Sequence, residues 1–434
     1  MASANTVAVD TRLPEGVRAG RLPLFLVVSL FFLWGVANNL NDVLVAQFKR
    51  AFTLSDFQSG LVQGAFYVGY FLVAIPAGMF MRRHGYKGAM LVGLLLYGVG
   101  ALLFWPAAAM ATYGMFLCAL FIIAGGLAFL ETSANPLVTL LGAPETAAAR
   151  LNWAQAFNPL GSIFGVLVGQ FFILSETRET PLSPTVSAAA RHAHAIHEAH
   201  AVQLPYLVIG LVVLGWAALI ASTRFPDAGR DDALELPRQG GALWRVLRSG
   251  RFMSAVAAQF FYVGAQVSVW SYTIRYVQAT MPGTPARQAA DFLTAALVCF
   301  MLGRFAGAAL MRYLRPPRLL AAFAVLDVLL AVFAAAVPGM PGACALVACS
   351  FFMSVMYPTI FALGVGDRHG DERKLGSSVL VMAIIGGAVL TGVMGAVSDA
   401  WGIAHAMFVP AVCFMVVLAF ACCRWKGQAG EKVA

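Results

Sequence analysis

Runs of about 20 apolar residues recur along the whole sequence, and each is long enough to cross a hydrocarbon layer of roughly 30 Å as an α-helix. Only 11% of the 434 residues are charged, whereas soluble proteins usually have about 25%. The hydropathy pattern therefore predicts an all-α membrane protein with twelve transmembrane helices. The predicted spans are 23–48, 58–80, 88–106, 112–142, 149–174, 204–222, 251–278, 290–313, 318–337, 341–364, 375–398 and 405–424.

The basic residues are distributed unevenly among the segments that connect these spans. If the N-terminus is cytoplasmic, 22 of the 29 lysines and arginines fall on cytoplasmic segments, as the positive-inside rule requires. The N-terminal segment lacks the pattern of a cleavable signal peptide, so we expect the first span to direct insertion. We predict that both termini are cytoplasmic and that the net charge of +9 reflects topology and not a surface for nucleic acid.

A charged segment at 224–250 divides the predicted spans into two groups of six. This division predicts two helical halves joined by a cytoplasmic linker. The predicted parts are a cytoplasmic tail at 1–22, an N-terminal six-helix half at 23–222, the linker at 223–250, a C-terminal six-helix half at 251–424 and a cytoplasmic tail at 425–434.

Two sequence patterns recur in both halves at nearly the same offset. Asn135-Pro136 is followed by a glycine six residues after the proline, and so is Tyr357-Pro358. A ridge of glycines at 161, 165 and 169 has counterparts at 387 and 395, and small residues at this spacing let helices approach closely. The recurrence indicates a duplicated six-helix unit, an arrangement that is common in transporters that bind substrate between their repeats.

Polar side chains interrupt several spans, although a charge at a helix centre costs about 2.5–3.5 kcal/mol on insertion scales. In the first span Asn38, Asn41 and Asp42 share one helical face, with Asn39 beside it, so this face should point into the bundle. Similar groups occur in other spans. They are Gln63, Tyr67 and Tyr70; Glu131 and Asn135; Asn152, Gln155 and Asn158; and Gln259, Tyr262, Gln266 and Trp270.

These groups allow two interpretations. Single amides often form hydrogen bonds between helices and have no further function. Amides and carboxyls together with Trp and Tyr rings also suit a sugar pocket, because the polar groups bind hydroxyls and the rings cover C–H surfaces. The number of such groups favours a sugar pocket.

Two buried carboxyls, Asp42 and Glu131, suggest coupling to protons. Burial penalises the charged form of a carboxyl, so such a group can take up a proton on one side of the membrane and release it on the other. The alternative is a permanently neutral acid that donates a hydrogen bond. Arg275 and Arg304 are possible counter-charges, and Asp327 has no polar neighbours in its own span.

Neither an enzyme active site nor a bound cofactor is predicted, apart from the proton as coupling ion. The seven cysteines form no metal-type CxxC and no disulfide framework. A predicted outside loop contains four histidines that either bind a metal or are solvated, and solvation is favoured because no suitable carboxylate pair accompanies them. These histidines are His192, His194, His197 and His200. The expected partners are a small sugar and membrane lipid, with no obligate protein partner.

Five segments resemble the fucose permease family of sugar:proton symporters, within the major facilitator superfamily. They are FFLWGVANNLNDVL (31–44), FLETSANPLVTLLG (129–142), RLNWAQAFNPLGSI (150–163), AQFFYVGAQVSVWSYTIRY (258–276) and YPTIFALG (357–364). The similarity extends from about residue 22 to residue 420. The resemblance implies the major facilitator fold, with Asp42 as the proton carrier and Glu131 in sugar recognition and coupling.

The resemblance also implies which residues line the cavity. The residues matched in this way are Asn39, Gln155 and Asn158 among the amides, and Trp34, Trp270 and Tyr357 among the aromatic residues. The helical stripes add Asn38, Asn135, Gln259, Tyr262 and Gln266 as candidate sugar-binding residues. One departure from the family pattern is Pro159, which removes a helix hydrogen bond next to Asn158.

We therefore expect a multi-pass transporter of a bacterial-type inner membrane that imports sugar with protons by alternating access. L-Fucose is the favoured sugar. Symport of another hexose (glucose or galactose) or of N-acetylglucosamine, sodium coupling, and export of a metabolite remain as alternatives.

Overall fold

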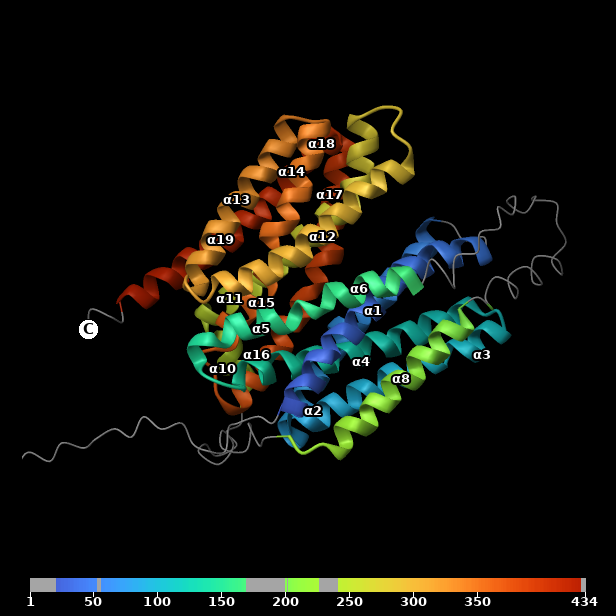
Figure 1. Cartoon of the computed structure of the whole chain (residues 1–434), viewed down its shortest axis with the longest axis vertical. Helices are drawn as coiled ribbons and strands as arrows, with labels where there is room; N and C mark the ends of the chain where they lie inside the picture. The colour runs from blue at the N-terminus through green and yellow to red at the C-terminus, as the bar shows by residue number, and fades with distance from the viewer. Residues whose placement is uncertain (1–20, 53–55, 169–199, 201, 226–240, 431–434) are drawn as a thin grey trace, which may run out of the picture.

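The computed structural model describes residues 21–52, 56–168, 200, 202–225 and 241–430, and every regular element among them is a helix (Figure 1). The helices of the first part are α1 (Arg21–Ala51), α2 (Asp56–Leu102), α3 (Phe104–Ala109), α4 (Tyr113–Leu140), α5 (Ala147–Gln155), α6 (Phe157–Val168), α8 (Gln203–Ser222) and α10 (Ala242–Arg248). Those of the second part are α11 (Gly250–Thr280), α12 (Ala286–Leu310), α13 (Pro316–Ala336), α14 (Met340–Met353), α15 (Met356–Val365), α16 (Gly370–Met382), α17 (Gly386–Trp401), α18 (Ile403–Ala406) and α19 (Phe408–Gly430).

Several predicted spans correspond to merged or divided helices. Within the described residues, nine helical segments are long and apolar enough to cross a membrane, and one of them, Gly64–Ala109, covers two predicted spans. The chain reverses between these two spans at Gly85, whose φ of 73° lies in the left-handed region that favours glycine. The predicted span 149–174 corresponds to α5 and α6, and the span 341–364 corresponds to α14 and α15.

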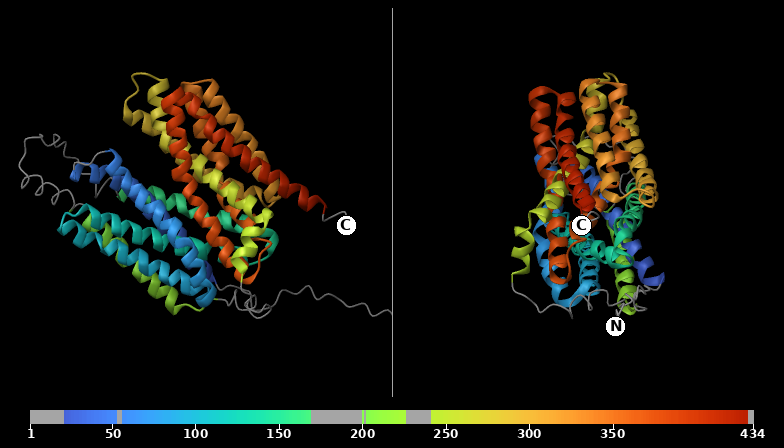
Figure 2. Two further views of the ribbon diagram at one scale, coloured as in Figure 1. Left: turned by 180° about the vertical axis from the view of Figure 1, so that it is seen from behind. Right: turned by 90° about the vertical axis from the view of Figure 1, so that its left-hand side faces the viewer.

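The helices form two bundles, α1 to α8 and α11 to α19, which touch at one end and diverge toward the other (Figures 1 and 2). The touching end is where α5, α10 and α16 lie (Figure 1). The part of α2 just before its turn at Gly85 also lies there, because Arg82 pairs with Asp371 of α16. α11 follows α10 directly, so it begins at this end as well. The contacts between the bundles therefore gather at one end of the molecule.

The predicted glycine ridge lies against the first helix. A Cβ atom on Gly161 would overlap the backbone carbonyl of Phe32, and one on Gly165 would lie 2.7 Å from the carbonyl oxygen of Val36. The backbones of α1 and α6 therefore touch, as the spacing of small residues predicts. The third glycine of the ridge, Gly169, lies outside the described residues.

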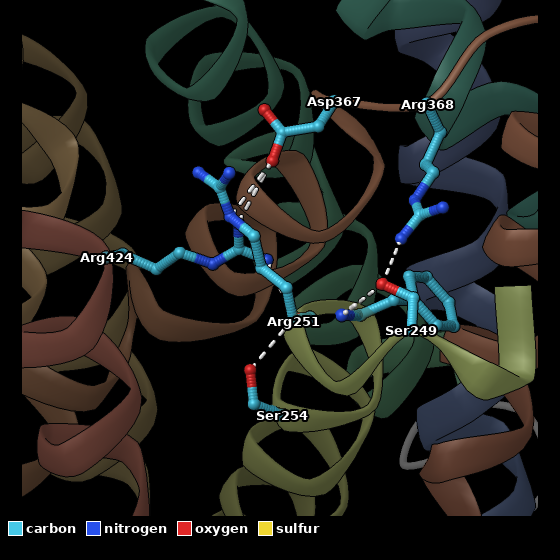
Figure 3. A network of polar contacts seen from close by, with 7 residues as sticks. Ser249, Arg251, Ser254, Asp367, Arg368 and Arg424 are labelled. Atoms are coloured by element: carbon cyan, nitrogen blue, oxygen red, sulfur yellow. Dashed lines mark hydrogen bonds and ion pairs between the residues drawn. The ribbon is translucent and has the colours of Figure 1, made fainter. Parts of the chain in front are cut away.

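A network of charges ties together the start of α11, the loop between α15 and α16, and the end of α19 (Figure 3). The Asp367 carboxylate accepts from Arg251 at 3.3 Å and from Arg424 at 3.1 Å. Nearby, Arg368 donates to Ser249 Oγ at 2.5 Å. Exposed ion pairs stabilise by about 0–1 kcal/mol each, so the network serves mainly to fix these three segments relative to one another.

Candidate functional site

The carboxyl of Glu131 lies where the two bundles meet. It projects from the middle of α4 in the first bundle, and it accepts a hydrogen bond from the hydroxyl of Tyr357 on α15 of the second bundle. Both side chains are buried, with 1% and 7% of their surface exposed. Tyr357 also lies next to Gln259 and Tyr70, so that the carboxyl is surrounded by polar groups from both bundles.

Amide side chains surround this carboxyl on the side of the first bundle. Gln155 at the end of α5 donates to Asn135 Oδ1 at 3.0 Å, and Asn135 lies one helical turn after Glu131 on α4. Asn152, one turn before Gln155, donates to Thr359 Oγ1 of the second bundle at 3.1 Å. The predicted stripes of α4 and α5 therefore face the second bundle and not lipid.

Many polar atoms of this region are buried and form no hydrogen bond of normal geometry with the residues that the structure describes. Native proteins leave few buried polar atoms unpaired, so a group of them marks a place where polar partners come from outside the protein. The indole of Trp34 lies next to the hydroxyl of Tyr70, which lies close to Glu131. Among the described residues of this region these atoms are Trp34 Nε1, Tyr70 OH, Glu131 Oε2, Thr132 Oγ1, Asn135 Nδ2, Asn152 Oδ1, both amide atoms of Gln259, and Tyr262 OH.

Three predicted site residues have other surroundings. The Asn158 amide donates to the carbonyl oxygen of Phe31 at 3.3 Å, so it joins α6 to α1. The indole of Trp270 donates to Ser350 Oγ at 3.2 Å and packs edge-on against Phe300. Gln266 is half-buried on α11, two turns after Gln259. The side-chain N–H groups of Asn158 and Trp270 therefore donate to acceptors within their own bundles.

The predicted polar stripe of the first span lies outside what the structure describes. The backbone of α1 is helical through this stretch, but the side chains of Asn38, Asn39, Asn41 and Asp42 are not among the described ones. Three loop histidines, His192, His194 and His197, also lie outside the described residues. His200 is described, and its Nδ1 lies 2.7 Å from Gln203 Oε1.

Within the described residues, no group of three His, Cys, Asp or Glu side chains could hold a metal ion. Asp327 on α13 is fully buried beside the thiol of Cys349. Its carboxyl oxygens have no hydrogen-bond partner among the described residues. Arg304 on α12 does belong to the site, since it lies close to Glu131 and Tyr262 and reaches the first bundle. Its role as a counter-charge stays a prediction.

Some residues of this region are not among the sugar-binding residues predicted from the sequence. Tyr70 and Asn152 follow the helical stripes already recognised in their spans, so the signal for them was present. Thr132 and Ser377 carried no usable signal, because single hydroxyl groups are common in membrane helices. Ser377 on α16 donates to the carbonyl oxygen of Thr132 at 3.0 Å, across the two bundles.

Two helical bundles that meet around buried polar groups define a transporter of the major facilitator type. Residues 25–382 match the family model described as Major Facilitator Superfamily. The chain is 47% identical to the L-fucose-proton symporter of Escherichia coli strain K12 over 417 residues, which cover 94% of this chain and 93% of the relative. The chain therefore belongs to the major facilitator superfamily and, within it, to the family of this symporter. It is a multi-pass membrane protein of a transporter family and not an enzyme.

Two further comparisons define the similarity. The glucose/galactose transporter of Brucella abortus is 36% identical over 389 residues, which cover 89% of this chain and 90% of the relative. The crystal structure of a major facilitator superfamily transporter, FucP, in the outward conformation matches with a TM-score of 0.85 and 46% identity, over 93% of this chain and 99% of that chain. This match confirms the predicted fold of twelve helices in two halves.

Proposed function

We propose that the protein is a sugar:proton symporter and that its sugar is L-fucose. The observation that carries the proposal is the buried Glu131 carboxyl, held by Tyr357 of the opposite bundle among unpaired donors and acceptors. Neutral hydroxyl groups of a sugar pair with donors and acceptors of this kind, and the rings of Trp34 and Tyr262 supply apolar faces. The 47% identity to an L-fucose-proton symporter supports this choice of sugar.

The proposed transport cycle is alternating access, in which the two bundles rock about the site. Residues 23–222 and 251–424 form the moving halves, and 223–250 is the linker. The distribution of basic residues supports a cytoplasmic location for both termini and for the touching end of the bundles. In this orientation the diverging end opens to the outside of a bacterial inner membrane, and sugar enters from there.

Asp42 and Glu131 have different roles in this proposal. Asp42 takes the proton from outside and releases it inside, and Glu131 links proton loading to sugar binding. Asn38, Asn39, Asn135, Gln155, Gln259 and the neighbouring aromatic residues bind the sugar hydroxyls. One elementary charge that crosses 100 mV supplies about 2.3 kcal/mol, which drives accumulation of the sugar.

A second candidate function is symport of glucose or galactose. The 36% identity to a glucose/galactose transporter favours it, and the unpaired groups at the site suit any neutral sugar. A metabolite exporter is disfavoured, because a pocket for hydrophobic compounds would be apolar.

The test is uptake of labelled sugars into proteoliposomes, with and without an imposed pH gradient and in sodium-free medium. We expect L-fucose to accumulate only with the gradient and to be displaced poorly by glucose and galactose. In the Asp42→Asn variant we expect sugar counterflow to persist and gradient-driven accumulation to be lost. Full accumulation by Asp42→Asn would contradict the role of Asp42, and preferred uptake of glucose or galactose would contradict the choice of sugar.

A further inference from the structure

Three prolines lie inside or between helices where the two bundles meet. Proline has no N–H, so in a helix it leaves the carbonyl four residues earlier without its usual partner. A carbonyl freed in this way needs another donor when it is buried. The prolines are Pro136 in α4, Pro159 in α6 and Pro358 in α15, and the carbonyls four residues earlier belong to Thr132, Gln155 and Ser354.

Each of these three carbonyls accepts a hydrogen bond from a side chain. The Ser377 hydroxyl lies 3.0 Å from Thr132 O and 2.8 Å from Lys374 O, so the two carbonyls share its single proton. Arg304 donates to the other two carbonyls, from Nη1 to Gln155 O at 2.7 Å and from Nε to Ser354 O at 2.9 Å. The bonds to Thr132 and Gln155 cross from the second bundle to the first.

The guanidinium of Arg304 donates to two of these backbone carbonyls and also lies close to Tyr262 and Glu131. The residue is 5% exposed, and its guanidinium lies 4.7 Å from the centre of the Phe300 ring. A charge buried in a membrane protein is costly unless hydrogen bonds satisfy it. The planar fork of Arg can reach two acceptors in fixed directions, whereas the ammonium of Lys is a compact point charge. The two carbonyls that lie four residues before Pro159 and Pro358 therefore form an acceptor pair suited to arginine.

We propose that Arg304 is a positioning residue that holds the two halves together through the carbonyl that Pro159 frees. We call the bond from Arg304 Nη1 to Gln155 O the clasp. The side chain of the same Gln155 donates to Asn135, so the clasp also fixes an amide of the proposed sugar site. Rocking of the halves breaks the bond from Arg304 to Gln155 O, and its strength sets the share of molecules that are open at the diverging end. The clasp is a feature of the ligand-free protein, and its consequence for sugar affinity rests on the proposed function.

The test measures external KM for L-fucose and the rate of exchange at saturating sugar in proteoliposomes. Pro159→Ala restores a backbone N–H at residue 159, which can donate to Gln155 O in place of Arg304. Arg304→Lys replaces the planar guanidinium by an ammonium, which cannot donate to both carbonyls in the same directions. We expect each change to reduce the fraction of molecules that are open at the diverging end to about one tenth, so that external KM rises about tenfold. In Pro159→Ala, exchange at saturating sugar stays within about twofold, because bound sugar restores that population. The double variant has the KM of Arg304→Lys alone, since Pro159→Ala affects only a bond that Arg304→Lys has already removed.

Pro76→Ala is the matched control. Pro76 also lies inside a helix, but it and Leu72, whose carbonyl it frees, are exposed on the lipid-facing side of α2. Pro76→Ala alone should have the KM of the wild-type protein. Pro76→Ala combined with Arg304→Lys should have the KM of Arg304→Lys alone. An unchanged KM in Pro159→Ala would overturn the clasp, and so would a double variant whose KM is the product of the two single effects. A general loss of exchange at unchanged KM would also overturn it, because this is the result of damaged folding alone.

Thermal unfolding of the wild-type protein, the three single variants and the two double variants in detergent tests the clasp without any sugar. The shifts in Tm caused by Pro159→Ala and Arg304→Lys should not add, whereas those of Pro76→Ala and Arg304→Lys should add. Additive shifts for the first pair would overturn the clasp. If the wild-type protein transports no sugar while the first pair is non-additive, the proposed function fails and the clasp stands.

Discussion

At the scale of single residues, Gln259 illustrates the energetic cost of a binding site. Its side chain is fully buried on α11 beside Tyr357, and among the described residues neither atom of its amide forms a hydrogen bond of normal geometry. A buried polar group without a partner costs about 1–3 kcal/mol. If the residue were purely structural, an apolar side chain would be more stable at this position. We therefore explain the buried amide by a ligand that pairs with it.

We predict that Gln259→Met makes the protein more stable and less able to bind sugar. Methionine fills nearly the same volume without the unpaired amide, so Tm should rise by several degrees, in keeping with about 1–3 kcal/mol. External KM should rise at least about tenfold, since a lost hydrogen bond in a buried site costs this much. Scanning fluorimetry and sugar uptake measure the two effects.

Gln203→Met is the control for this prediction. Gln203 is also buried, but its amide donates to the carbonyl of Trp105 at 3.2 Å and its oxygen pairs with His200. The same substitution there should lower Tm and leave KM unchanged. A fall in Tm for Gln259→Met, similar to that of Gln203→Met, would show that the Gln259 amide is satisfied and structural.

At the scale of helices, the sequence predicted which segments pack closely but not the partners of each contact. The glycine ridge of 161 and 165 predicted a close approach, and the structure supplies α1 as the partner. The echo of Asn135-Pro136 in Tyr357-Pro358 predicted a repeat. It did not predict that Glu131 would contact Tyr357, because this contact depends on how the two repeats dock. Helical periodicity gives the face of a residue, whereas cross-bundle contacts require the tertiary arrangement.

We predict that Gly161→Ala destabilises the protein by about 1–3 kcal/mol, the usual cost of overpacking. The added methyl would overlap the backbone carbonyl of Phe32, and a backbone atom cannot move aside as a flexible side chain can. Gly215→Ala on α8 is the control, because no atom lies within 4 Å of its added methyl. Thermal unfolding in detergent should show a lower Tm for Gly161→Ala than for the wild-type protein, and an unchanged Tm for Gly215→Ala. Equal Tm values would contradict the close contact of α1 and α6.

At the scale of the whole molecule, hydrogen bonds and ion pairs between the bundles gather at the touching end. Besides the buried bonds of Ser377 and Arg304, Arg82 at the end of the predicted second span pairs with Asp371 of α16 at 3.0 Å. The sequence predicted the number of spans and the two halves. It could not predict which end is closed, because a transporter of this kind must form more than one arrangement from the same residues.

We predict that a disulfide across the touching end stops transport. A Cβ atom on Gly78 of α2 would lie 3.0 Å from the Cβ atom of Ser378 on α16, and a disulfide needs about 3.5–4.5 Å, so a small adjustment suffices. Gly78→Cys combined with Ser378→Cys should lose uptake on oxidation and regain it on reduction. The single variants, treated in the same way, should keep their uptake. A protease site placed in the linker reports the bond, because cleaved halves stay joined only when it has formed. Undiminished uptake by the joined protein would contradict opening of this end, and therefore alternating access.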